Sequence, residues 1–202
     1  GGAIEMDDDP NRSIVIDASV ARSCGDGNAR ARMCKDFLKT ATDVRLRAVM
    51  TQALTNEWSK HSSGYARTWL VSMTGKRLLK RIQDAENSLL RRKLRHTTDD
   101  DAVNEAMMKD VFLIEAALAT DNTIVPLDEK ARYHFRISAL SVDMLSNIVW
   151  VNPGSDDEAP IPWAQQGAKP EPCRTLGWRT EQGKHTKNGV AATTAGNAAD
   201  HG

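Results

Sequence analysis

Long apolar runs are missing from this chain of 202 residues. No stretch approaches the roughly 18 to 20 apolar residues that a membrane-spanning helix requires. The opening segment, Gly1–Glu5, also lacks the basic region and apolar core of a signal peptide. The sequence therefore predicts a protein without a membrane partner.

The chain also has few cysteines and no formal net charge. The three cysteines, Cys24, Cys34 and Cys173, are odd in number and have no paired CxxC spacing, which argues against a disulfide framework and a zinc site. A reducing cytoplasm fits this pattern best. Lys and Arg together number 27, as do Asp and Glu, so the formal net charge is zero. Without a global field, a nucleic-acid partner must bind a local patch.

A local basic patch is present between residues 76 and 95, where the only opposing acids are Asp84 and Glu86. We predict that this patch binds RNA, because Lys and Arg give sequence-independent affinity for phosphates. A solvated helix face is the alternative reading. The predicted RNA-binding residues are Lys76, Arg77, Lys80, Arg81, Arg91, Arg92, Lys93 and Arg95.

Length and composition predict one domain with a tail, because about two-fifths of the residues are apolar. We expect a flexible segment over residues 1–12 and a folded domain over 13–152, in which residues 65–97 form a basic helical insertion. Residues 153–202 are rich in Pro, Gly, Ala, Asp and Lys, and are expected to be largely disordered or to wrap around the core. A few apolar residues there are candidates for packing on the core or binding a partner: Ile161, Trp163, Leu176 and Trp178.

Apolar periodicity predicts alternating strands and helices, which implies an α/β sandwich. The predicted strands are Ser13–Asp17, Arg45–Met50, Thr123–Leu127 and Asn147–Val151. The predicted helices cover residues 28–40, a segment that starts at Gln52, two helices within 65–95, and residues 102–120 and 129–136.

Acidic residues recur where such a fold would place a ligand. Asp17 and Asp128 lie at the carboxyl ends of predicted apolar strands. Open α/β sheets bind their ligands at these ends. Glu57 follows the second strand on a helix. Asp110 shares a helical face with apolar residues such as Leu113, and a carboxylate on such a face needs a partner. A divalent cation would satisfy several of these acids at once.

Four segments in this order resemble the motifs of the PIN-domain ribonucleases, including the VapC-like toxin ribonucleases. They are Ile14–Ser19, Leu54–Trp58, Lys109–Ala119 and Ile124–Asp128. The resemblance covers about residues 13–151. It implies a PIN-like three-layer sandwich around a central, mainly parallel sheet of four or five strands, with the basic helical excursion and the loose C-terminal tail added.

The resemblance also implies a function. Asp17, Glu57, Asp110 and Asp128 would be catalytic and would hold Mg²⁺ or Mn²⁺, hard cations that prefer oxygen ligands. Ser19 would hydrogen-bond to these carboxylates without itself binding the metal. The expected activity is a metal-dependent endoribonuclease acting on RNA, with the role of a toxin or defence effector. An antitoxin-like inhibitory protein and a second copy of the chain are the expected protein partners.

Other interpretations stay open at this stage. Asp17 can cap the following helix, Glu57 can be a solvated acid, and Asp128 can be a turn residue. The family often has Ser or Thr at the position of Pro126, which puts one supporting hydrogen bond in doubt. A catalytically inactive PIN-like scaffold that binds RNA or protein is therefore the main alternative. A haloacid-dehalogenase-like phosphatase fits less well, because Ser19 stands where its second Asp belongs.

Overall fold

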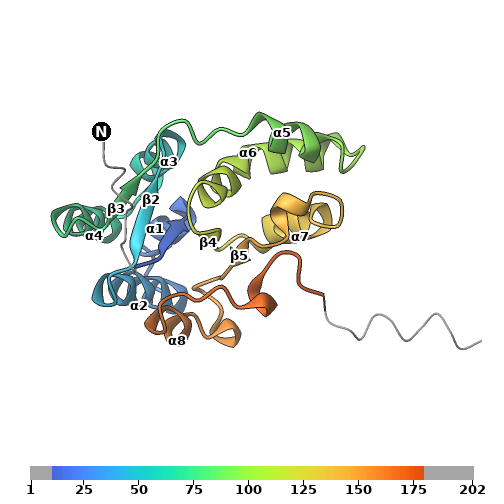
Figure 1. Cartoon of the computed structure of the whole chain (residues 1–202). Coiled ribbons are helices and arrows are strands. Elements are labelled where there is room, and N and C mark those ends of the chain that lie inside the picture. The colour runs from blue at the N-terminus through green and yellow to red at the C-terminus, as the bar shows by residue number, and fades with distance from the viewer. Residues whose placement is uncertain (1–10, 180–202) are drawn as a thin grey trace, which may run out of the picture.

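The computed structural model describes residues 11–179, which form a three-layer α/β sandwich (Figure 1). Its central sheet has five strands, all parallel, in the order β3-β2-β1-β4-β5. The predicted fold class is thereby confirmed. The strands are β1 (Ser13–Ile16), β2 (Arg47–Met50), β3 (Leu79–Arg81), β4 (Thr123–Val125) and β5 (Val149–Trp150).

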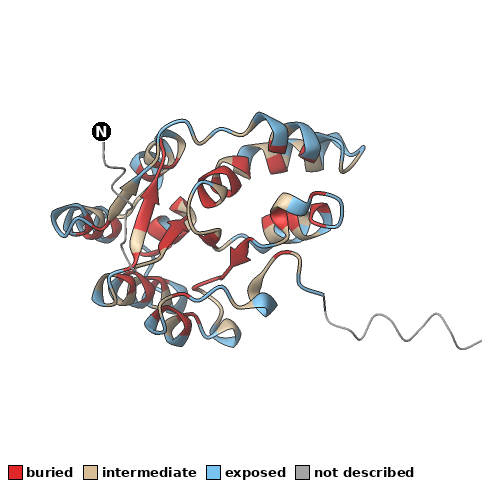
Figure 2. Ribbon diagram, in the orientation of Figure 1, coloured by how far each residue is buried: buried red, intermediate tan, exposed pale blue. Residues whose placement is uncertain are grey.

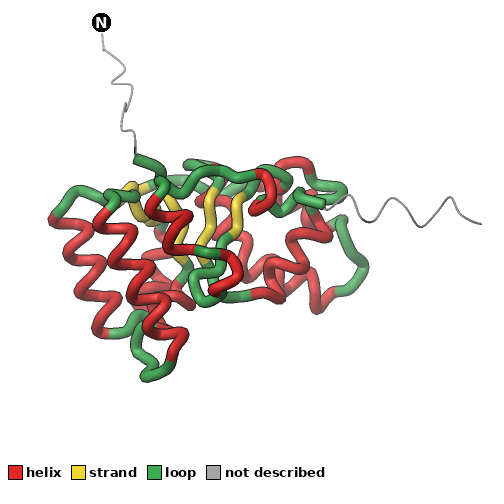
Figure 3. Tube along the Cα trace, turned by 90° about the horizontal axis from the view of Figure 1, so that it is seen from below, coloured by secondary structure: helices red, strands yellow, loops and turns green. Residues whose placement is uncertain are grey.

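Two groups of helices cover the sheet. The first group packs α1, α2, α3, α4 and α8 against one another, and the second packs α6 between α5 and α7. Figure 3 shows the strands side by side with helices running alongside them. The helices are α1 (Ala18–Ser23), α2 (Ala29–Asp43), α3 (Gln52–His61), α4 (Gly64–Gly75), α5 (Ser88–Arg95), α6 (Asp101–Leu118), α7 (Glu129–Ser138) and α8 (Pro160–Gln165).

The core lies on both faces of the sheet, and strands β1, β2, β4 and β5 are buried along almost their whole length, whereas the edge strand β3 is not (Figure 2). Ile14, Val15, Ile124 and Val125 are fully buried, as expected for parallel strands covered by helices on both faces. Within residues 11–179, no helix combines the length and apolar character needed to cross a bilayer.

The segment predicted as two basic helices does contain two helices, α4 and α5, but a strand of the central sheet lies between them. Its first part is helix α4, but residues 79–81 form strand β3, which pairs with β2 in the register Ala48↔Leu79. Only the last part, α5, is helical again. The predicted helical insertion is therefore wrong in this stretch. Charged residues suit β3 because it is an edge strand, where they discourage pairing with other chains.

Part of the predicted loose tail belongs to the core. Trp163 on α8 is 1% exposed and stacks on Phe37 of α2, with ring centroids 6.5 Å apart. Leu176 is also buried, and Thr175 bridges to Val149 of β5. The wrapping alternative is thus correct up to Arg179, and the disordered one is wrong there. Residues 1–10 and 180–202, where the flexible N-terminal segment and the rest of the tail were predicted, lie outside the described residues.

Candidate functional site

The candidate site lies where the order of the strands reverses. The chain runs from β1 outward to β2 and β3, then returns to β4 on the other side of β1 and continues to β5. The crevice at the carboxyl ends of β1 and β4 is therefore the switch point of the sheet, where open α/β folds bind their ligands. Asp17 directly follows β1, and Asp128 is the third residue after the end of β4. The Asp17 N–H donates to the Val125 carbonyl at 3.1 Å, which joins the two strand ends.

Helix α3 carries Glu57 to this crevice. Thr51 caps the helix, since its hydroxyl accepts from the Leu54 N–H. One residue after Glu57, the Trp58 indole N–H donates to the Ile16 carbonyl at 2.9 Å, next to Asp17. Trp58 is 2% exposed, so it anchors α3 on the end of β1.

Helix α6 brings Asp110 to the same place, because α6 packs across both β1 and β4. Its buried face includes Val111, Leu113 and Ile114, which hold the helix on the sheet. Asp110, Asp17, Glu57 and Asp128 all line one open hollow of about 760 Å³. The structure thus brings the four predicted site residues together.

The carboxylates interact electrostatically. The pKa of the Asp110 carboxyl is raised to about 6, mainly by burial and also by the charges of Asp17, Asp128 and Glu57, while Lys109 lowers it. Burial also raises the pKa of Asp17, although hydrogen bonds from Ser19 oppose that rise. Clustered acids of this kind destabilise their own charged forms, which a cation would relieve.

Ser19 joins the two strand ends through its hydroxyl group. The hydroxyl donates to Asp17 Oδ2 at 2.5 Å and accepts from the Leu127 N–H at 3.3 Å. It therefore orients Asp17 and fixes the main chain just before Asp128. Ser19 thus hydrogen-bonds directly to the Asp17 carboxylate, as a residue that positions Asp17 would.

Asp17, Asp128 and Glu57 also have the structural contacts that the alternative interpretations predicted. Asp17 caps α1 by accepting from the Ser19 N–H, and Asp128 caps α7 by accepting from the Ala131 N–H at 2.9 Å. A carboxylate has about four lone-pair positions, so a cap leaves room for another ligand. Glu57 is 3.4 Å from the Lys60 ammonium and 3.5 Å from the His61 imidazole.

A metal site is not preassembled. Among residues 11–179, no group of three or more His, Cys, Asp or Glu side chains is arranged to hold a metal ion. The donors themselves suit Mg²⁺ or Mn²⁺, because all four are carboxylates and these hard cations prefer oxygen ligands. For Glu57 to join such an ion, its carboxylate has to turn away from Lys60 and His61.

Three basic residues in the hollow escaped the sequence analysis: Arg22, Arg30 and Lys109. They come from α1, α2 and α6, so they do not form a run that a search for basic patches would find. His61 of α3 also lines the hollow. Because of Arg22, Arg30 and Lys109, the acidic hollow contains charges of both signs. The cations among them could bind a phosphate group.

The predicted basic patch lies elsewhere. Lys76 and Arg77 precede β3 and lie at the amino edge of the sheet, opposite the acids. Arg91 is engaged by Glu115, with its side-chain nitrogens 2.7 and 3.1 Å from the carboxylate oxygens. Arg81 lines a second hollow. None of the eight predicted RNA-binding residues lines the acidic hollow.

Two other acids are excluded from the site. Asp121 accepts from the Ser13 N–H at 2.6 Å, so it lies at the start of β1, the wrong edge of the sheet. Glu115 is 3% exposed and is held by Arg91 and the Asn87 N–H. Both carboxylates have structural partners.

Comparisons with models of protein families, with curated proteins and with solved structures found no match. The functional argument therefore depends on the geometry of the hollow and on the resemblance of the four motifs.

Proposed function

We propose that this protein is an endoribonuclease that depends on Mg²⁺ or Mn²⁺. One observation carries the proposal: the four predicted carboxylates, which come from the carboxyl ends of β1 and β4 and from helices α3 and α6, line a single hollow together with Asp26 at the switch point of a parallel sheet. Burial and the repulsion between these carboxylates favour a cationic ligand, since burial first and the neighbouring acids second raise the pKa of Asp110. The open hollow is also wide enough to admit a nucleotide, within the usual range of about 300 to 1,000 Å³ for ligand pockets.

The residues that line the hollow would have different roles in the reaction. Asp17, Asp110 and Asp128 would hold the ion, which would supply Lewis acidity and a more acidic bound water. Glu57 is partly exposed at the mouth of the hollow and would serve as a further ligand or orient the attacking water. Arg22, Arg30 and Lys109 would bind the phosphate and offset its charge. Ser19 would keep Asp17 in position.

The biological setting extends the same proposal. The VapC-like resemblance favours a toxin or defence effector that an antitoxin-like protein restrains and that pairs as a homodimer. The three cysteines are all free thiols, as a reducing cytoplasm would leave them.

Cleavage of labelled single-stranded and structured RNA tests the proposal. We expect Mn²⁺-dependent cleavage that EDTA abolishes and that Asp17→Asn lowers by more than about a hundredfold, beyond the effect of losing an outer-shell partner. Asp36→Asn is the matched control, because this acid is exposed on α2 and outside the hollow. Absence of cleavage by the wild type, or equal activity of the Asp17→Asn variant, would reject the proposal.

One observation favours the inactive scaffold as a second candidate: the acids are not preassembled around an ion. Isothermal calorimetry separates the two functions. A nuclease should bind Mn²⁺ in a manner that requires Asp110 and Asp128. A scaffold should bind RNA or protein without binding Mn²⁺.

A further inference from the structure

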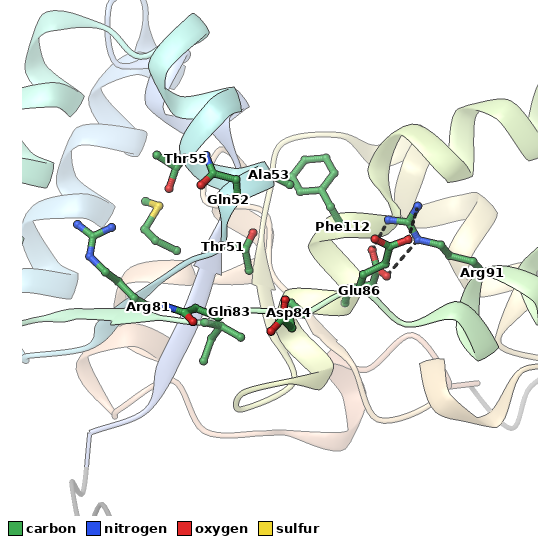
Figure 4. Close-up of a pocket in the computed structure, with 14 residues that line it drawn as sticks. Thr51, Gln52, Ala53, Thr55, Arg81, Gln83, Asp84, Glu86, Arg91 and Phe112 are labelled. Carbon is green, nitrogen blue, oxygen red and sulfur yellow. Dashed lines mark hydrogen bonds and ion pairs between the residues drawn. The ribbon is translucent and has the colours of Figure 1, made fainter.

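A second hollow lies beside the acidic one. It measures about 650 Å³ and opens at the carboxyl ends of β2 and β3 (Figure 4). Helices α3 and α6 border both hollows: α3 contributes Gln52 here and Glu57 there, and Phe112 of α6 lines both. The two hollows therefore adjoin at Phe112, and the pair is called the trench below.

The charges of this second hollow do not suit a phosphate. Its acids are Asp84, Glu86 and Glu115, and its cations are Arg81 and Arg91. Arg91 pairs with Glu115 at 2.7 Å and more loosely with Glu86 at 3.6 Å. The three acids outnumber the two cations, so a phosphate would meet net repulsion.

The hollow instead offers the groups that recognise an unpaired base. Phe112 is a partly buried aromatic ring between Ala53 and Arg91 in Figure 4. Single-stranded RNA is bound by stacking of its bases on such rings and by hydrogen bonds to their Watson–Crick edges. Asp84 and Glu86 are exposed, and an ionised carboxylate accepts hydrogen bonds but donates none. The ion pair between Glu86 and Arg91 uses Oε1 of Glu86, which leaves Oε2 as its acceptor. Guanine presents two adjacent donors on that edge, N1–H and the N2 amino group, which match the two oxygens of one carboxylate.

The loop that carries these acids is held in place. The Ile82 N–H donates to the Met50 carbonyl at 3.0 Å, and the far end of the loop is held by Glu115 through Asn87 N–H and Arg91. Arg91, which was expected to contact RNA, thus positions the loop. A fixed loop favours selective recognition, because little ordering is required on binding.

We propose that this second hollow binds an unpaired guanine next to the phosphodiester in the acidic hollow, with Phe112 as the stacking surface and Asp84 and Glu86 as acceptors. The position relative to cleavage rests on the proposed nuclease function. The base recognition does not, since it requires only that RNA enters the trench.

Fluorescence anisotropy with two labelled RNA hexamers tests this subsite without any cleavage. One hexamer has a single guanine among adenines, and the other is all adenine; both are titrated with the full chain in EDTA. We expect the guanine hexamer to bind about tenfold more tightly. Phe112→Leu should weaken both complexes about tenfold, because the ring is lost while apolar packing is retained.

The double variant Asp84→Asn with Glu86→Gln should abolish the preference for guanine and leave binding of the adenine hexamer unchanged or slightly stronger. Asp84 has a φ of 52°, a conformation that Asn also tolerates, so the exchange spares the backbone. Glu105→Gln is the control, because this exposed acid of α6 lies outside both hollows. Circular dichroism checks that each variant is folded.

The outcomes separate this subsite from the nuclease. Equal affinity for the two hexamers, or a guanine preference that survives the double variant, overturns the subsite even if the wild type cleaves RNA. The expected pattern in a protein that never cleaves RNA with Mn²⁺ supports the subsite and rejects the nuclease.

Discussion

Replacing Asp110 by Asn should stabilise the metal-free protein at neutral pH. The folded carboxyl has a pKa of about 6 against an ordinary value of 3.8, because it is buried close to three other carboxylates. A shift of this size corresponds to about 3 kcal/mol of destabilisation once the group is charged. Partial exposure to solvent lowers the expected gain to about 1 to 2 kcal/mol.

The pH dependence has a definite sign. A raised pKa means that the folded state binds the proton more tightly than the unfolded state, so folding is favoured while the carboxyl is protonated. The penalty is absent below pH 3.8, grows between pH 3.8 and about 6, and is complete above that value. The stability gain of Asp110→Asn should therefore be full at pH 7.5 and small at pH 4.

Urea unfolding followed by tryptophan fluorescence measures this effect, with and without Mn²⁺. In EDTA at pH 7.5 the variant should be more stable than the wild type. Mn²⁺ at a hundred times its dissociation constant should stabilise the wild type by about 2.7 kcal/mol and the variant far less. Glu105→Gln, an exposed change on the same helix, should alter neither quantity. A less stable variant in EDTA, or equal stabilisation of both proteins by Mn²⁺, would refute the reasoning.

Two further substitutions test the supports of the trench. Ser19→Ala removes the hydrogen bonds to Asp17 and to the main chain, so calorimetry should show Mn²⁺ affinity about tenfold weaker; unchanged affinity would contradict the positioning role. Arg91→Met leaves the buried Glu115 without its cation and should cost about 2 to 4 kcal/mol in urea unfolding. A cost below about 0.5 kcal/mol, typical of surface changes, would show that this pair is dispensable.

The acidic residues were predictable because their positions depend on local sequence. Asp17 and Asp128 follow apolar runs that form buried strands, and parallel strands bring their carboxyl ends to one edge. Asp110 was found from the apolar face of its helix. In each case a short stretch of chain fixes both the element and the side of the residue, so distant contacts were not required.

Strand β3 was missed because nothing local defines it. It has three residues, and the apolar side chains around it, Leu78, Leu79 and Ile82, have spacing that also suits a helix. Pairing with β2 decides the outcome, and propensity for a strand depends strongly on such neighbours. The trench was missed with it, since the loop after β3 forms one of its walls.

The roles of the basic residues were equally hidden. A run of Lys and Arg predicts a phosphate-binding face, but the sequence does not reveal that Arg91 has a buried partner 24 positions away. Arg22, Arg30 and Lys109 meet only because α1, α2 and α6 converge on the same hollow. Charges from separate elements become a patch through tertiary structure alone.

Helix capping accounts for only two of the four carboxylates, Asp17 and Asp128. The contacts that assemble this edge are made by other groups: the Trp58 indole N–H on the Ile16 carbonyl, and the Asp17 main-chain N–H on the Val125 carbonyl. The acids add caps to short helices but also repel one another, as the raised pKa of Asp110 indicates. Residues kept together against their own repulsion are expected at functional sites, where binding of a ligand offsets the cost. That imbalance is the physical reason to look for a cation in this hollow before any other ligand.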